Sequence, residues 1–159
     1  KHFPGHGNTT ADSHYGYAVT DKTLEELRAC EFIPFARGID SGVGMIMVGH
    51  ISAPNAAGND LPSTFSPVMI GDVLRGELGF TGVVITDALN MGAITNQYSS
   101  GEAAVMALQA GADLLLMPED FQSAYLEVLY AVQNGAISVA RIDESVARIL
   151  LLKKQSLDW

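Results

Sequence analysis

The sequence predicts an α/β fold built on a parallel sheet. Three apolar runs of strand length alternate with helix-like segments, and such alternation is typical of parallel strands joined by helical crossovers. His50 and Asp87 directly follow the first two runs, at the strand ends where barrel enzymes assemble their active sites. No G-x-G-x-x-G fingerprint follows any run, which weakens a nucleotide-binding sheet. A doubly wound sheet and a TIM barrel both fit the alternation, and the barrel is favoured.

The first elements come from the opening of the chain. The KHF at residues 1–3 is expected to be a strand, and residues 21–37 are expected to form a helix that Pro34 breaks or kinks. The apolar run VGMIMVG, residues 43–49, lies between glycines, as a strand buried on both faces does.

The later elements carry clear start and stop signals. Ser66 followed by Pro67 begins a helix, and Gly79, Gly111 and the pair Asn134-Gly135 end helices. The expected order is a helix over 66–79, a strand over Val83–Thr86, a helix over Gly101–Ala110, a strand over Asp113–Met117 before Pro118, a helix over Phe121–Gln133, and a last helix begun by Ser138 with Val139, Ile142, Val146, Ile149 and Leu150 at helical spacing.

These elements make about half of a barrel. A TIM barrel has eight strands and about 250 residues, whereas this chain has 159 residues and four expected strands. We therefore expect residues 1–159 to be the C-terminal half of one catalytic barrel, about strands 5 to 8 with their helices. The N-terminal half is expected as a partner, cleaved off, disordered or carried on a separate chain, because half a barrel exposes two unpaired sheet edges.

Composition excludes some functions. Eighteen acidic and nine basic residues give a net charge of −9 and a pI near 4.6, so nucleic acid is an unfavourable partner. No stretch has the roughly 20 apolar residues of a membrane span. The lone Cys30 lies in an apolar helical pattern and is expected to be buried. The cell compartment is left open, with the bacterial cytoplasm and the cell exterior both compatible.

The opening stretch KHFPGHGNTTADSH concentrates titratable groups, and three kinds of site compete for it. A metal site could use His2, His6, Asp12 and His14, but Pro4 and Gly5 disfavour the helix that the spacing of the first two histidines needs. No C-x-x-C or H-E-x-x-H signature supports a metal, and no G-K-[ST] ending supports a phosphate cradle. We expect neither a metal nor another cofactor.

Proton transfer is the third possibility. Asp12 and His14 can place a carboxylate beside an imidazole, which suits a general acid near neutral pH, although both can also be ordinary loop residues. Asp87 leaves the end of a buried strand, a rigid position that suits a nucleophile, although an aspartate there can also cap a helix. His50 can contact a substrate or be a satisfied strand-end histidine, and Asp113 is expected to be structural.

The motifs resemble those of glycoside hydrolase family 3, in its β-N-acetylglucosaminidase (β-hexosaminidase) branch. The resemblance rests on KHFPGHG followed by DSH, then MIMVGHI, then GVVITDALNMGAI, with GADLLLMP as weaker support. It runs nearly end to end in order and spacing, and the first and third motifs are specific. Asn8 departs from the pattern, since the family often has aspartate there.

The resemblance implies a TIM-barrel domain that cleaves glycosides with retention through a covalent glycosyl-enzyme. It implies that Asp87 is the nucleophile, that His14 is the general acid/base paired with Asp12, and that Lys1, His2 and Met91 line the sugar pocket. His50 is kept as a further sugar-binding candidate. Family residues of the first barrel half also grip the sugar, so this chain alone is expected to be inactive.

The expected activity is removal of terminal β-linked N-acetylglucosamine from oligosaccharides, with peptidoglycan fragments as the expected source. The D-S-H triplet favours this branch over the β-glucosidase branch, whose acid/base glutamate commonly comes from a second domain. Three alternatives stay open. An imidazole acid/base does not repel phosphate as a carboxylate would, which allows a phosphorylase. A β-glucosidase-like member and a barrel that binds glycans without cleaving them are the other two.

Overall fold

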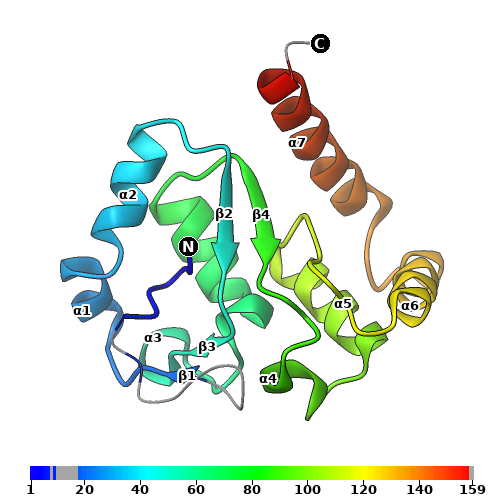
Figure 1. Ribbon diagram of the computed structural model, residues 1–159, viewed down its shortest axis with the longest axis horizontal. Coiled ribbons are helices and arrows are strands. Elements are labelled where there is room, and N and C mark those ends of the chain that lie inside the picture. Colours follow the sequence, from blue (N-terminus) through cyan, green and yellow to red (C-terminus); the bar gives the residue numbers. More distant parts are fainter. Residues whose placement is uncertain (8, 10–17, 158–159) are drawn as a thin grey trace.

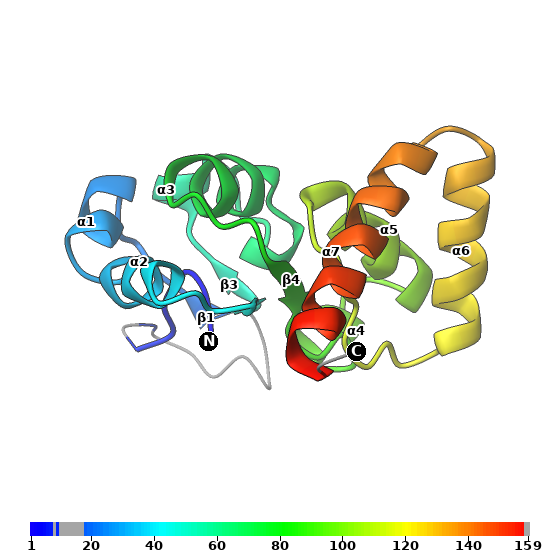
Figure 2. The same cartoon turned by 90° about the horizontal axis from the view of Figure 1, so that it is seen from above.

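The computed structural model describes residues 1–7, 9 and 18–157 (Figure 1). Two short strand pairs lie at its centre, with α1 and α2 on one side and α5, α6 and α7 on the other (Figures 1 and 2). In chain order the elements are β1 (Ala18–Val19), α1 (Leu24–Ala29), α2 (Ile33–Asp40), β2 (Met45–Val48), β3 (Ile51–Ser52), α3 (Pro54–Ala57), the 3-10 helix η1 (Ser63–Phe65), the π-helix η2 (Val68–Glu77), β4 (Val83–Thr86), α4 (Gly92–Thr95), α5 (Ser100–Ala110), α6 (Phe121–Gln133) and α7 (Val139–Leu157).

The central strands β2 and β4 run parallel, with Met45 opposite Val83 and Val48 opposite Thr86. A parallel bridge joins Phe3 to β2, and another joins Leu114 to β4. The four segments therefore lie side by side in chain order. Such a sequential row is the order of strands in a barrel, whereas a doubly wound sheet reverses its strand order.

Each of the outer two segments pairs with its neighbour through a single bridge. The predictions of full strands at KHF and at 113–117 are therefore wrong. Phe3 donates to the carbonyl of Met47 and accepts from the amide of Gly49, at 2.8 Å each, but the next residue is proline and has no N–H to continue. On the other side, the Leu116 amide donates to the Thr86 hydroxyl at 2.9 Å instead of to the main chain. The ladder stops there.

A second parallel pair, β1 with β3, was not expected. Each strand has two residues, which is too short for a hydrophobic period. Because β3 begins three residues after β2 ends, this pair lies beyond the carboxyl end of the central sheet. It therefore borders the place where His50 follows β2.

The helix predicted over 21–37 is two helices. Thr23 and Glu26 cap α1 reciprocally, and α1 ends at Ala29. Pro34 lies in the first turn of α2, where its missing N–H costs nothing, so the predicted break falls just before it. The break exposes Cys30, and the expectation of a buried thiol is wrong.

The remaining helices begin and end close to their predicted signals. The Ser66 hydroxyl accepts from the Met69 amide at the start of η2, which ends with a bond from the Leu78 amide to the carbonyl of Val73, five residues back. Ser99 forms a capping box with Glu102 at α5. At α7 the Ser138 hydroxyl accepts from the Arg141 amide, as predicted.

The main core packs η2, α2 and the opening segment against β2 and β4. Phe3 is fully buried, and its ring stacks on Phe32 and meets the edge of Phe35, at centroid distances of 5.4 and 5.2 Å. A smaller core joins α5 to α6 and the start of α7.

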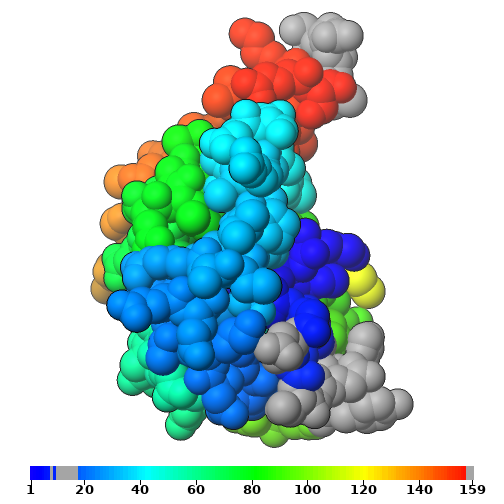
Figure 3. Space-filling view, turned by 90° about the vertical axis from the view of Figure 1, so that its left-hand side faces the viewer, coloured from blue at the N-terminus to red at the C-terminus, as the bar shows by residue number. Residues whose placement is uncertain are grey.

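Apolar side chains also cover an outer surface of the last two helices, which we call the outer apolar set. The residues of this set are 41–73% exposed. The set consists of Phe121, Tyr125, Leu126, Leu129 and Tyr130 on α6 and Val139, Val146, Leu150 and Leu151 on α7. The C-terminal turns of α7 project beyond the rest of the molecule (Figure 3). Part of the apolar stripe predicted for α7 therefore lacks a core within the described residues.

Candidate active site

The candidate site lies at the carboxyl ends of β2 and β4. Asp87 is the first residue after β4, and its amide donates to the carbonyl of Val48, the last residue of β2, at 2.9 Å. This bond fixes the main chain of Asp87 to the neighbouring strand. Its side chain is 14% exposed, so the carboxylate is mostly buried but reachable.

One carboxylate oxygen of Asp87 is held and the other faces the opening segment. Oδ1 accepts from the Ala88 amide at 2.9 Å. Oδ2 lies 3.8 Å from Nε2 of His2. The helix-cap alternative is wrong, because α4 begins at Gly92 with Met91 at its cap position. Asp87 is therefore a rigidly held carboxylate beside an imidazole.

The close approach of His2 depends on Gly49. A Cβ at Gly49 would lie 3.1 Å from Cβ of His2 and 3.3 Å from Cδ1 of Ile51, tighter than nearly all such contacts. Burial lowers the pKa of His2, and the nearby Asp87 only partly opposes this effect. His2 is thus a neutral imidazole at neutral pH, and the 3.8 Å contact is not an ion pair.

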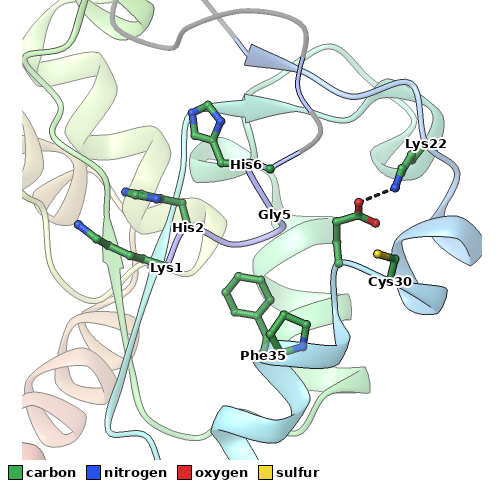
Figure 4. A pocket seen from close by; sticks show the side chains of 10 residues that line it. Lys1, His2, Gly5, His6, Lys22, Cys30 and Phe35 are labelled. Atoms are coloured by element: carbon green, nitrogen blue, oxygen red, sulfur yellow. Dashed lines mark hydrogen bonds and ion pairs between the residues drawn. The ribbon is translucent and has the colours of Figure 1, made fainter.

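Lys1 is exposed next to His2, and both side chains extend away from the Lys22–Glu31 ion pair (Figure 4). The ring of His6 meets that of His2 edge to face, with centroids 6.0 Å apart. Its Nδ1 lies 2.9 Å from the Thr9 hydroxyl, which donates to the carbonyl of His6. His6 therefore stabilises the turn of the opening segment.

A cavity of about 660 Å³ adjoins the opening segment. Lys1, His2 and His6 line it, together with Cys30 and Glu31, but Asp87 is not among its lining residues. The cavity therefore adjoins the candidate site from the side of Lys1 and His2.

The other predicted site residues divide into three groups. Met91 is partly exposed at the start of α4, and its amide donates to the carbonyl of Ala88. His50 is fully buried behind Asp87, with both ring nitrogens in contact with neighbours. Asp12 and His14 lie outside the described residues, as does Asn8.

The contacts of Asp113 are with residues outside this site. Its buried carboxylate accepts from Arg75, Arg148 and Ser145, as well as from the amide of Val84. These contacts match the structural interpretation.

Thr64 is a residue that the sequence did not single out. It is fully buried in η1, and its hydroxyl lies 2.9 Å from Nδ1 of His50. No local pattern identifies it, since the two residues are 14 positions apart.

Among the described residues, no group of three or more His, Cys, Asp and Glu side chains is arranged to hold a metal ion. Within the same part of the chain, no helix has the length and apolar character of a membrane span.

Comparison with known proteins identifies the family. The model of the glycosyl hydrolase family 3 N-terminal domain matches residues 1–152. This chain belongs to glycoside hydrolase family 3. The matched model is that of the N-terminal domain, so the expected "C-terminal half" can refer only to a position within that domain, never to a C-terminal domain of the family.

Its relatives in family 3 include hexosaminidases. A β-hexosaminidase of Stenotrophomonas maltophilia strain R551-3 is 40% identical over 164 residues, covering 100% of this chain and 44% of the relative. A family 3 β-N-acetylglucosaminidase of Paenibacillus sp. FPU-7 is 45% identical with a TM-score of 0.94, covering 98% of this chain and 30% of that one. A β-glucoside phosphorylase is 28% identical with a TM-score of 0.89, over 96% of this chain and 29% of that one. The family 3 chain is an α/β part of a barrel domain and spans less than half of these relatives.

Proposed function

We propose that this chain is the second half of the catalytic barrel of a retaining β-N-acetylglucosaminidase. Its four parallel segments would be about strands 5 to 8, and a first barrel half would pair with both open edges of the row. The outer apolar set supports this placement, because these side chains need a partner surface. The activity below is that of the completed barrel, meaning residues 1–159 joined to a first half, which the Paenibacillus relative can supply.

The observation that carries the proposal is the position of Asp87. Its Oδ1 is held by the Ala88 amide while Oδ2 faces the open side next to His2. In the first step, a carboxylate oxygen of Asp87 bonds to the anomeric carbon as the glycosidic C–O bond breaks. His14 gives a proton to the departing oxygen, a role that rests on the family resemblance. Asp12 would orient that histidine.

In the second step, His14 takes a proton from water as the water oxygen bonds to the anomeric carbon. The bond to Asp87 breaks, and the carboxylate is restored with net retention of configuration. Lys1 and the neutral His2 would donate hydrogen bonds to sugar hydroxyls, and Met91 would line the pocket. The substrate would be an oligosaccharide ending in β-linked N-acetylglucosamine, with peptidoglycan fragments as its expected source.

Asp87→Asn in the completed barrel tests the nucleophile with an aryl β-N-acetylglucosaminide. We expect kcat to fall by at least about 1,000-fold, because an amide cannot form the glycosyl ester. The exposed Asp72 supplies a matched control, Asp72→Asn, which should leave kcat unchanged. Proton NMR should show the β anomer of the free sugar forming first. Full turnover by Asp87→Asn would refute the proposal, and so would binding of the glycan without hydrolysis by the unaltered barrel.

A phosphorylase is the second candidate, favoured by the likeness to the β-glucoside phosphorylase. Here a phosphate oxygen, instead of water, would attack the anomeric carbon of the glycosyl–Asp87 ester. Hydrolysis in phosphate buffer yields free N-acetylglucosamine, whereas phosphorolysis yields the sugar 1-phosphate. Phosphorus NMR separates the two, and a dominant sugar 1-phosphate signal would replace the hydrolase assignment.

A further inference from the structure

His50 connects two segments behind the candidate site. It lies two residues after the end of β2, and its side chain is fully buried. Its Nε2 lies 3.0 Å from the carbonyl oxygen of Ala88, and its Nδ1 lies 2.9 Å from the hydroxyl oxygen of Thr64. A residue with no exposed surface and two occupied ring nitrogens has no atom left for a sugar.

The partners of His50 determine its tautomer. A carbonyl oxygen only accepts, so Nε2 carries the hydrogen and donates to Ala88. Burial lowers the pKa of His50, with the Ala88 contact and the nearby Asp87 opposing the shift and His2 adding to it. The ring is therefore neutral at neutral pH. Its Nδ1 faces the hydroxyl of Thr64, whose single hydrogen is shared with the carbonyl of Gly49 at 3.0 Å.

The contact matters because Ala88 also holds Asp87. The Ala88 amide donates to Oδ1 of Asp87, while its carbonyl accepts from His50 and from the Met91 amide at 3.1 Å. Both main-chain groups of Ala88 are thus fixed. The amide and the carbonyl of Ala88 belong to two peptide planes that meet at its Cα. Holding the carbonyl therefore limits the rotations at Ala88 that would swing its amide away from the carboxylate of Asp87.

We propose that His50 is a positioning residue for Asp87. It acts through Ala88, by holding the peptide group whose neighbouring N–H sets the rotamer of the carboxylate. The inference rests on the proposed role of Asp87 as the nucleophile. It replaces the earlier expectation that His50 binds the sugar, and it gives Thr64 the task of fixing the imidazole ring.

Two substitutions in the completed barrel separate the two contacts of His50. In His50→Gln the side-chain amide nitrogen can occupy the place of Nε2 and still donate to Ala88. In His50→Asn the shorter amide reaches only the place of Nδ1, so the contact with Thr64 survives and the one with Ala88 is lost. The pair keeps polarity matched while changing reach.

We expect His50→Asn to lower kcat by about 10- to 100-fold, the usual effect of a misplaced reacting group, with KM changed by less than about twofold. His50→Gln should keep kcat within about threefold of the unaltered barrel. Rates are taken per folded molecule, with the folded fraction measured by thermal unfolding. Equal kcat for both variants, or a raised KM with normal kcat, would overturn the proposal.

Asp87→Asn, measured alongside, keeps this inference distinct from the proposed function. If Asp87→Asn stays active, the proposed nucleophile fails whatever the His50 variants do. If Asp87→Asn is inactive while His50→Asn has normal kcat, only the positioning role is refuted.

Discussion

At the scale of single residues, Gly49 is where the fold and the candidate chemistry meet most closely. It lies between the last residue of β2 and His50, and its missing side chain leaves room for Cβ of His2. His2 in turn faces Asp87. The glycine therefore serves the spacing of two predicted site residues rather than a turn.

Gly49→Ala should displace His2 by a few tenths of an ångström, because the new methyl would lie 3.1 Å from Cβ of His2. We expect kcat/KM of the completed barrel to fall by about 10-fold or more, since small displacements of positioning groups are costly. Gly71→Ala is the matched control, as a Cβ there meets nothing within 4 Å. A normal kcat/KM in Gly49→Ala would show that His2 does not need this spacing.

The buried imidazole of His50 also predicts a pH dependence of stability. In the unfolded chain its pKa is about 6.5, and burial lowers the folded-state pKa. The unfolded state therefore binds more protons below pH 6.5, so the free energy of unfolding should fall as the pH drops below that value. At higher pH this contribution is fully present.

Urea unfolding of the completed barrel between pH 7.5 and about 5 measures this slope. His50→Gln should flatten it, because glutamine does not titrate. His2 also has a lowered pKa, so His2→Gln measures how much His2 contributes to the slope. An unchanged slope in His50→Gln would mean that the buried imidazole is not neutral in the folded state.

At the scale of elements, the sequence predicted helices and the central strands better than the outer strands. The apolar run of β4 matched its predicted bounds because both neighbours satisfy its main chain. The run after Asp113 is equally apolar, but Leu116 bonds to the Thr86 side chain, and no periodicity encodes such a contact. Likewise Asp87 could be found from its place after a strand, whereas Thr64 is defined only by folding next to His50.

Asp113 attaches α7 to the sheet. Its carboxylate has no exposed surface and receives Arg148 and Ser145 from α7, Arg75 from η2, and the amide of Val84 from β4. One buried negative charge thus joins three elements at the amino end of β4. Ser138 starts the same helix, so α7 is fixed both by its cap and by this cluster.

Asp113→Asn should lower the free energy of unfolding by about 3 kcal/mol, the low end for a buried pair, because the partly buried guanidinium groups of Arg75 and Arg148 lose their counter-charge. Asp143→Asn, exposed on α7, should change it by less than about 0.5 kcal/mol. The value of kcat per folded molecule should stay normal in both, as Asp113 makes its contacts away from Asp87. Urea unfolding checks the first expectation, and a loss confined to kcat would contradict it.

At the scale of the whole molecule, the described sheet has open edges and the outer apolar set has no cover within the described residues. In a closed barrel each strand has two neighbours and each helix packs against the next. Here Phe3 and Leu114 are the outermost bridged residues of the described row, and α7 presents Val146 and Leu150 without cover from the described residues. These open edges and uncovered side chains are what the proposed barrel half would present to its partner.

This incompleteness predicts association. The chain and a separately produced first half of the Paenibacillus relative should form a 1:1 complex in analytical ultracentrifugation and hydrolyse the aryl β-N-acetylglucosaminide, which neither does alone. Leu150→Gln should weaken the complex by about 10-fold or more, because burying a leucine contributes about 1.5 to 3 kcal/mol. Lys153→Gln, exposed on the same helix, should change affinity by less than about twofold because exposed charges contribute little. Equal weakening by both substitutions would place the interface elsewhere, and turnover by the chain alone would show that residues 1–159 need no first half.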